Sequence, residues 1–171
     1  AHEWLKSLGK PEAVCAVPGN HDAYVKGGLE KALATYGAYM TGETLDKEPF
    51  PYLRRVGQVA LVGLSSAIPT GPFIAAGQIG ADQIERTGKL LKLLGDAGYF
   101  RVVMIHHPPY PEYADSRRLG LWDAVQLRTM LKETGAELIL HGHTHQSTAN
   151  AIAGPEREIP VIGVAAASAT P

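Results

Sequence analysis

Apolar residues recur along the chain in two spacings, which predict strands and helices in turn. Continuous apolar runs at 13–17 and 101–105 are typical of buried strands. The segment 81–95 instead spaces its large apolar residues so that they share one side of a helix. These residues are Ile84, Leu90, Leu91 and Leu94. Strands that alternate with helices indicate an α/β layered fold with a mixed sheet.

The same reasoning predicts the remaining elements. The segments 52–56 and 58–64 are predicted strands joined by a turn near Gly57, so they are expected to form a hairpin. A Gly/Pro-rich loop is predicted at 65–78. Further helices are predicted at 3–8, 29–36 and 122–134, and further strands at 137–140, about 147–152 and 159–164. A length of 171 residues fits one domain, 1–171.

Composition and charge narrow the class of protein. Hydrophobic residues make up 45 % of the chain and charged residues 19 %, which is typical of a globular protein. The 16 basic and 17 acidic side chains leave a net charge of -1, so any phosphate binding must be local. No apolar stretch approaches the roughly 20 residues of a membrane span. The one cysteine, Cys15, cannot form an intrachain disulfide and is expected in a buried strand. We expect the protein to be cytoplasmic.

Six of the seven histidines directly follow predicted strands. They are His21 after 13–17, His106 and His107 after 101–105, and His141, His143 and His145 after 137–140. In α/β sheets, the loops at the carboxyl ends of the strands converge on one edge, where ligands bind. Three separate segments therefore deliver imidazoles to one predicted crevice.

Several of these side chains are suited to holding metal ions. Neutral imidazoles at the spacing of His143 and His145 can bind one ion or two neighbouring ones, and the Asn20 amide oxygen can complete a mixed site. Structural interpretations remain open for each. The histidines can be ordinary loop residues, Asn20 can form an Asx-turn, and Asp22 can cap the helix near 29.

Three short motifs follow strands in a fixed order. They are Gly19-Asn20-His21-Asp22, His106-His107-Pro108-Pro109 and Gly142-His143-Thr144-His145. This series resembles the last three motifs of the calcineurin-like metallophosphoesterases, and the similarity extends from residue 1 to about 166. The resemblance implies an α-β-β-α sandwich with mixed sheets. Two earlier family motifs, Asp-x-His and Gly-Asp-x-x-Asp, do not occur in the 171 residues, so we expect a domain truncated at its N-terminus.

The resemblance also implies roles for individual residues. Asn20, His106 and His143 would ligate one divalent ion, and His145 would contribute to a second. His21 would be a general acid that protonates the departing alkoxide. The two ions, which would be Mn²⁺, Fe or Zn²⁺, would activate a bridging hydroxide for in-line attack on phosphorus.

A loop after the second motif is predicted to contact substrate. It contains Tyr110, which offers a stacking face, and Arg117 and Arg118, which can hold phosphate oxygens. The alternative is a solvated loop with an incidental arginine pair. His107 and His141 are expected to support the structure rather than to ligate metal.

The resulting hypothesis is a hydrolase of phosphomonoesters or phosphodiesters, with a small diester such as a cyclic nucleotide as the favoured substrate. Two alternatives remain. A nuclease is disfavoured by a pI of about 6.7, because nucleic-acid tracks need clustered cations, so nucleic acid is not an expected partner. The second alternative is a binding scaffold that has lost catalysis. Because the early carboxylates are missing, we expect residues 1–171 alone to be nearly inactive.

Overall fold

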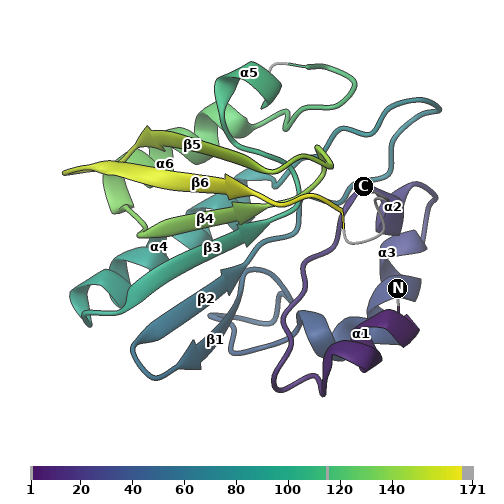
Figure 1. Ribbon diagram of the computed structural model, residues 1–171, viewed down its shortest axis with the longest axis horizontal. Helices are drawn as coiled ribbons and strands as arrows, with labels where there is room; N and C mark the ends of the chain where they lie inside the picture. The colour runs from purple at the N-terminus through teal and green to yellow at the C-terminus, as the bar shows by residue number, and fades with distance from the viewer. Residues whose placement is uncertain (1, 115, 167–171) are drawn as a thin grey trace.

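Six strands form one mixed sheet in the order β1-β2-β3-β4-β6-β5 (Figure 1). The structure is a computed structural model that describes residues 2–114 and 116–166. Parallel pairing joins β2, β3, β4 and β6, whereas β1 and β5 are antiparallel strands at the two edges. The strands are β1 (Tyr52–Val56), β2 (Val59–Gly63), β3 (Phe100–Ile105), β4 (Leu138–His141), β5 (Thr148–Ala153) and β6 (Glu158–Gly163).

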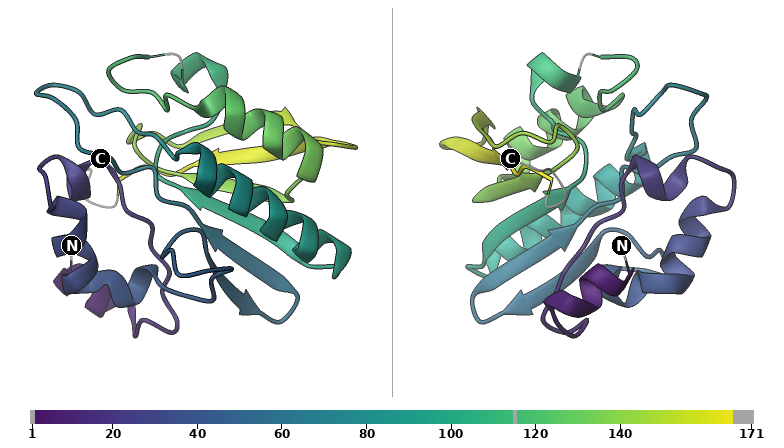
Figure 2. Two further views of the ribbon diagram at one scale, coloured as in Figure 1. Left: turned by 180° about the vertical axis from the view of Figure 1, so that it is seen from behind. Right: turned by 45° about the vertical axis from the view of Figure 1, so that its right-hand side comes forward.

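Two long helices cover one face of this sheet. They are α4 (Ala81–Asp96) and α6 (Ala124–Thr134), which lie side by side behind the strands in Figure 1 and in front of them in the left view of Figure 2. The remaining helices are α1 (His2–Leu8), α2 (Asn20–Ala23), α3 (Gly28–Tyr36), the 3-10 helix η1 (Gly37–Met40) and α5 (Pro111–Ala114). Figure 1 shows α2 and α3 on the side toward which β4 and β6 point.

The main core lies between the sheet and these two helices. Leu91 of α4 and Leu131 of α6 are fully buried against strand residues such as Val103 and Ile139. Leu138 alternates with Ile139 along β4 and is only half-buried, because it points to the other face of the sheet. The sheet is therefore anchored mainly through its helix-covered face.

Most predicted elements are confirmed. The hairpin forms as β1 and β2 with Val56 opposite Val59, and Gly57 turns it with a φ of 57°. The predicted helix at 81–95 forms as α4, and the strands of the second half form within one or two residues of the expected ends. The α/β class with a mixed sheet is thus confirmed.

The predicted buried strand at 13–17 is wrong. Ala13 ends a turn and residues 14–17 pair with no strand of the described chain, because their polar groups bond to side chains and to η1 rather than to the backbone of a neighbouring strand. The Ala16 N–H donates to the Tyr39 carbonyl (2.9 Å), and the Tyr52 hydroxyl donates to the Ala16 carbonyl (2.7 Å). Cys15 is accordingly half-buried rather than buried.

Across residues 2–114 and 116–166, no helix combines the length and the apolar character that a bilayer crossing requires.

Candidate metal centre

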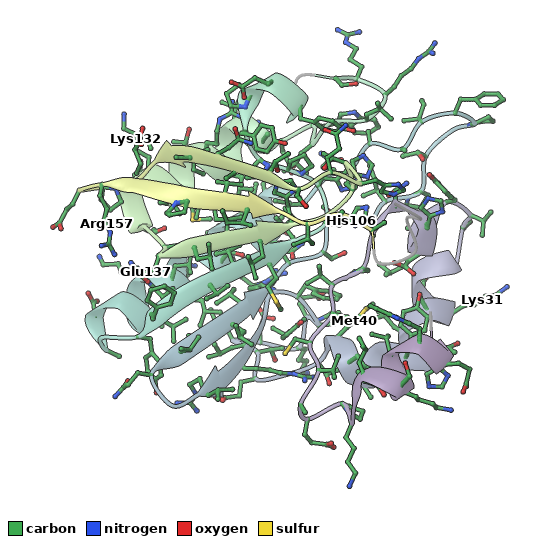
Figure 3. The ribbon with its side chains drawn as sticks, viewed as in Figure 1. Lys31, Met40, His106, Lys132, Glu137 and Arg157 are labelled. Atoms are coloured by element: carbon green, nitrogen blue, oxygen red, sulfur yellow. The ribbon has the colours of Figure 1, made fainter. Side chains whose placement is uncertain are left out.

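Three segments that are far apart in sequence meet beyond the carboxyl ends of the parallel strands. His106 directly follows β3, His143 follows β4 after Gly142, and Asn20 begins α2. The Gly142 N–H donates to the His106 carbonyl (3.1 Å), which joins the first two segments. Figure 3 shows His106 between the strand ends and the α2–α3 side of the molecule, and it shows Glu137 at the opposite end of the sheet. The convergence predicted from the strand ends is therefore present.

The donor atoms of these three residues form a triangle. His106 Nε2 lies 2.8 Å from Asn20 Oδ1 and 3.1 Å from His143 Nδ1, and His143 Nδ1 lies 3.2 Å from Asn20 Oδ1. We call this set the metal-ligand triangle. Metal–ligand bonds of about 2.0–2.2 Å place neighbouring donors about 3.0 Å apart on an octahedral ion and about 3.4 Å apart on a tetrahedral one. The triangle therefore fits three ligands of a single divalent ion.

His143 is held in the tautomer that a ligand needs. Its Nε2 lies 2.9 Å from the Leu119 carbonyl, which can only accept, so the proton is assigned to Nε2 and Nδ1 keeps its lone pair. The φ of His143 is 69° and that of His145 is 56°, which is the left-handed region that most non-glycine residues avoid. Such a conformation costs on the order of 1 kcal/mol per residue and is typical of functional loops.

His106 is neutral over the physiological pH range. Burial, reinforced by the neighbouring His107 and His143, lowers the pKa of His106 to about 3. Burial also lowers the pKa of His143, and the hydrogen bond to Leu119 only partly opposes this effect. Because protonated imidazoles cannot ligate, these shifts favour metal binding at neutral pH.

His107 lies beside the metal-ligand triangle but is not one of its ligands. One ring nitrogen each of His106, His107 and His143 lies within 4.8 Å of the other two. Both ring nitrogens of His107 are nevertheless occupied: Nε2 donates to the Ala75 carbonyl (3.0 Å), and Nδ1 accepts from the Ser66 hydroxyl (2.7 Å). The ring is fully buried, and burial lowers its pKa to about 4. We therefore assign it a supporting role, as the sequence led us to expect.

His141 has a similar environment. It is 3 % exposed, its Nδ1 lies 2.9 Å from the Gly142 carbonyl, and its Nε2 lies 3.4 Å from the Thr148 hydroxyl. Burial lowers its pKa, so the ring is uncharged near neutral pH. These contacts hold the loop that leads from β4 to His143.

His21 and His145 are exposed beside the metal-ligand triangle. His21 follows the buried Asn20 in α2, and its ring meets the Tyr24 ring edge-on at 4.9 Å. His21 and His145 are close enough that their charges contribute to lowering the pKa of His106. Both side chains therefore face solvent at the edge of the site.

Asp22 has a local structural role. Its carboxylate accepts from the Gly19 N–H (2.8 Å) and from the Tyr36 hydroxyl. It therefore caps α2 and fastens it to α3, rather than capping the helix that begins at Gly28. Burial and this carboxylate together raise the pKa of Tyr36 above its ordinary value.

The predicted substrate loop is only partly placed as expected. Arg117 and Arg118 are exposed, and the Arg118 carbonyl accepts from the Ala75 N–H (2.7 Å). Tyr110 is 7 % exposed within the main core, with its ring 5.5 Å from that of His141. Contrary to the prediction, burial leaves the Tyr110 ring without an open face for a substrate.

Comparison with known proteins identifies the family. A protein of Synechococcus sp. (strain WH7803) named "probable cyclic nucleotide phosphodiesterase" is 36 % identical over 90 residues, which cover 52 % of this chain and 34 % of that protein. A Rhodococcus erythropolis (strain PR4 / NBRC 100887) protein with the same description is 27 % identical over 161 residues, or 90 % of this chain and 49 % of the relative. The chain thus spans half or less of the length of these curated relatives. The family model described as calcineurin-like phosphoesterase matches residues 1–147, and the chain therefore belongs to the calcineurin-like phosphoesterase family.

Proposed function

We propose that this chain takes part in the metal-dependent hydrolysis of a phosphodiester, with a small diester such as a cyclic nucleotide as its substrate. The observation that carries the proposal is the metal-ligand triangle of Asn20, His106 and His143, whose donor atoms lie within 3.2 Å of one another. Family membership and the descriptions of the two relatives also support it.

We assign these ligands to two divalent ions of the Mn²⁺, Fe or Zn²⁺ type, for which the neutral side chains of this chain supply only part of the ligand set. Asn20, His106 and His143 would hold one ion, and His145 would contribute to the other. When bound, such ions supply positive charge that polarises the phosphate and promotes deprotonation of water. Since all four ligands are uncharged, they leave that positive charge largely available to an anionic substrate.

His21 is the residue to which we assign proton transfer. It follows Asn20 in α2, is exposed to solvent, and lies edge-on against the ring of Tyr24. An imidazole there can donate its proton to the departing alkoxide oxygen. Arg117 and Arg118 project from the loop whose Leu119 carbonyl holds His143, and we assign them to the phosphate oxygens.

The proposal is tested by His21→Ala in the intact protein. A proton donor is worth about 10²–10⁴-fold in rate and matters least when the leaving group is already a stable anion. We therefore expect a loss of this size with an alkyl diester, a much smaller loss with an activated aryl diester, and unchanged metal content by elemental analysis. His2→Ala, which changes a half-buried histidine of α1 outside the three site motifs, is the matched control. Equal losses with both substrates, or loss of metal, would refute the assignment.

A further inference from the structure

An open, largely apolar pocket of about 560 Å³ lies next to the metal-ligand triangle. It is lined by Tyr24 and by residues 70–75. We call it the ring pocket. Both views of Figure 2 show the loop that contains 70–75 projecting beside α2. None of the lining side chains is a carboxylate, lysine or arginine, so the pocket suits a neutral ligand group rather than a phosphate.

Hydrogen bonds connect both sides of the ring pocket to the candidate metal centre. The Asn20 amide, whose oxygen belongs to the metal-ligand triangle, donates through Nδ2 to the Tyr24 hydroxyl (2.5 Å). On the other side, the Ala75 carbonyl accepts from His107, whose ring centroid lies 4.3 Å from that of His143. A phosphate at the metal-ligand triangle would therefore have its attached organic group at the mouth of the ring pocket.

Phe73 is the most exposed large hydrophobic residue among those described. Its side chain is 94 % exposed, and its φ is 63°, a left-handed conformation that aromatic residues rarely adopt. Neighbouring hydrogen bonds hold the loop in this shape: the Thr70 hydroxyl donates to the Ile74 carbonyl (2.6 Å), and the Ala75 N–H donates to the Arg118 carbonyl (2.7 Å). The loop thus presents an aromatic side chain to solvent.

We propose that the ring pocket binds the nucleobase of the substrate, with Phe73 and Tyr24 providing stacking surfaces. The proposal rests on the proposed function, since it assumes that the phosphate of the same substrate lies at the metal-ligand triangle. Stacking on an aromatic side chain is tolerant of base identity. The ring pocket therefore selects for an aromatic base over a bare sugar phosphate, without choosing strictly among bases.

The experiment compares AMP, ribose 5-phosphate and adenosine by calorimetry with the intact protein and Mn²⁺. Phe73→Ala is expected to weaken AMP and adenosine binding by about 5- to 150-fold, the effect of one stacked base. Ribose 5-phosphate binding is expected to stay unchanged, and Phe73→Tyr is expected to restore the affinity for AMP. Phe100→Ala is the matched control, because Phe100 is 47 % exposed at the other end of β3.

Three results would overturn the proposal. The first is AMP binding no more tightly than ribose 5-phosphate in the unaltered protein. The second is an equal loss of both ligands, or of neither, in Phe73→Ala. The third is a change confined to self-association or to protein partners in sedimentation, which would make Phe73 a protein contact.

Failure of the proposed function can be distinguished from failure of the ring-pocket proposal. Adenosine has no phosphate, so its binding reports on the ring pocket whether or not metal is bound. If Asn20→Ala leaves Mn²⁺ affinity unchanged, the metal assignment fails while the result for the ring pocket stands.

Discussion

Gly19→Ala probes how tightly the metal-ligand triangle is built. The backbone of Gly19 is extended, with φ −114°, so alanine fits the conformation without strain. A Cβ at this position would lie 2.7 Å from Cε1 and Nδ1 of His106 and 2.8 Å from its Cγ. The imidazole ring is therefore the first group that the new methyl group meets.

The size of the effect follows from these contacts. Ordinary carbon contacts are about 3.5–4.0 Å, so the new methyl group is too close by about 1 Å. His106 has to move by a similar amount, which takes its Nε2 out of the 2.8 Å contact with Asn20 Oδ1. We expect a loss of about 10–100-fold in metal affinity, as for disturbed ligand support, and a stability loss of about 1–3 kcal/mol from overpacking.

Zn²⁺ titration against a chromophoric chelator measures the first effect, and thermal unfolding measures the second. Gly37→Ala is the matched control, because its new Cβ would meet only Leu33 at 3.5 Å or more, an ordinary contact. A Gly19→Ala variant that binds Zn²⁺ as tightly as the unaltered chain would show that His106 does not ligate in the observed position.

Three further predictions concern the ion pair between Arg101 and Glu137, the loop that carries Arg117 and Arg118, and the absence of charge on the assigned metal ligands. Burial raises the pKa of Glu137, but hydrogen bonds from Arg101 outweigh it and hold the pKa below its ordinary 4.5. The ionised carboxylate therefore stabilises the fold above about pH 4.5 and loses this effect as the pH falls. We expect Glu137→Gln to lower the free energy of unfolding in urea by about 2–3 kcal/mol at pH 7 and by less at pH 3.5. An equal cost at both values would contradict the pairing. Arg117→Ala and Arg118→Ala should each weaken substrate use several-fold with metal binding intact, and unchanged kinetics in both would remove the loop from the mechanism. A polypeptide limited to 1–171 should bind Mn²⁺ weakly and turn over little diester, because its assigned ligands are all neutral, and two tightly bound ions with robust turnover would refute this.

The hydrophobic pattern identified elements that are longer than one helical turn. The helix α4 and the hairpin of β1 and β2 have periodic patterns, and both were predicted nearly to their ends. The apolar run at 13–17 predicted a buried strand, but the segment is only half-buried and forms no strand. An apolar run does not specify which strand or side chain its backbone will bond to. The segment's carbonyls are bonded by Tyr52 and by the Arg54 guanidinium, and no local pattern encodes those long-range contacts.

Four-residue helices were also beyond prediction. The helices α2, η1 and α5 each have four residues, which is too short for an apolar period to repeat. The consequence for the site is direct, because α2 is the element that buries Asn20 and exposes His21.

The candidate site likewise contains features that the sequence could predict and features that it could not. The placement of His106 and His143 after strands predicted their convergence, and it is the topology of parallel strands that makes this prediction possible. The carbonyls of Leu119 and Ala75, which fix two histidine tautomers, could not be predicted, since every residue carries a carbonyl. The prediction for Tyr110 was wrong because the sequence does not show whether an aromatic residue after a strand packs into the core or faces the substrate.

These backbone contacts tie the candidate metal centre to the loops around it. One loop supplies the Ala75 carbonyl that fixes His107, and a second supplies the Leu119 carbonyl that fixes His143. The two loops pair with each other, since the Gly77 N–H donates to the Gly120 carbonyl (3.0 Å). A shift of either loop must therefore break a hydrogen bond to an imidazole or carry that ring with it. Because the first loop also forms the ring pocket, a ligand that moves this loop must act on the histidines as well.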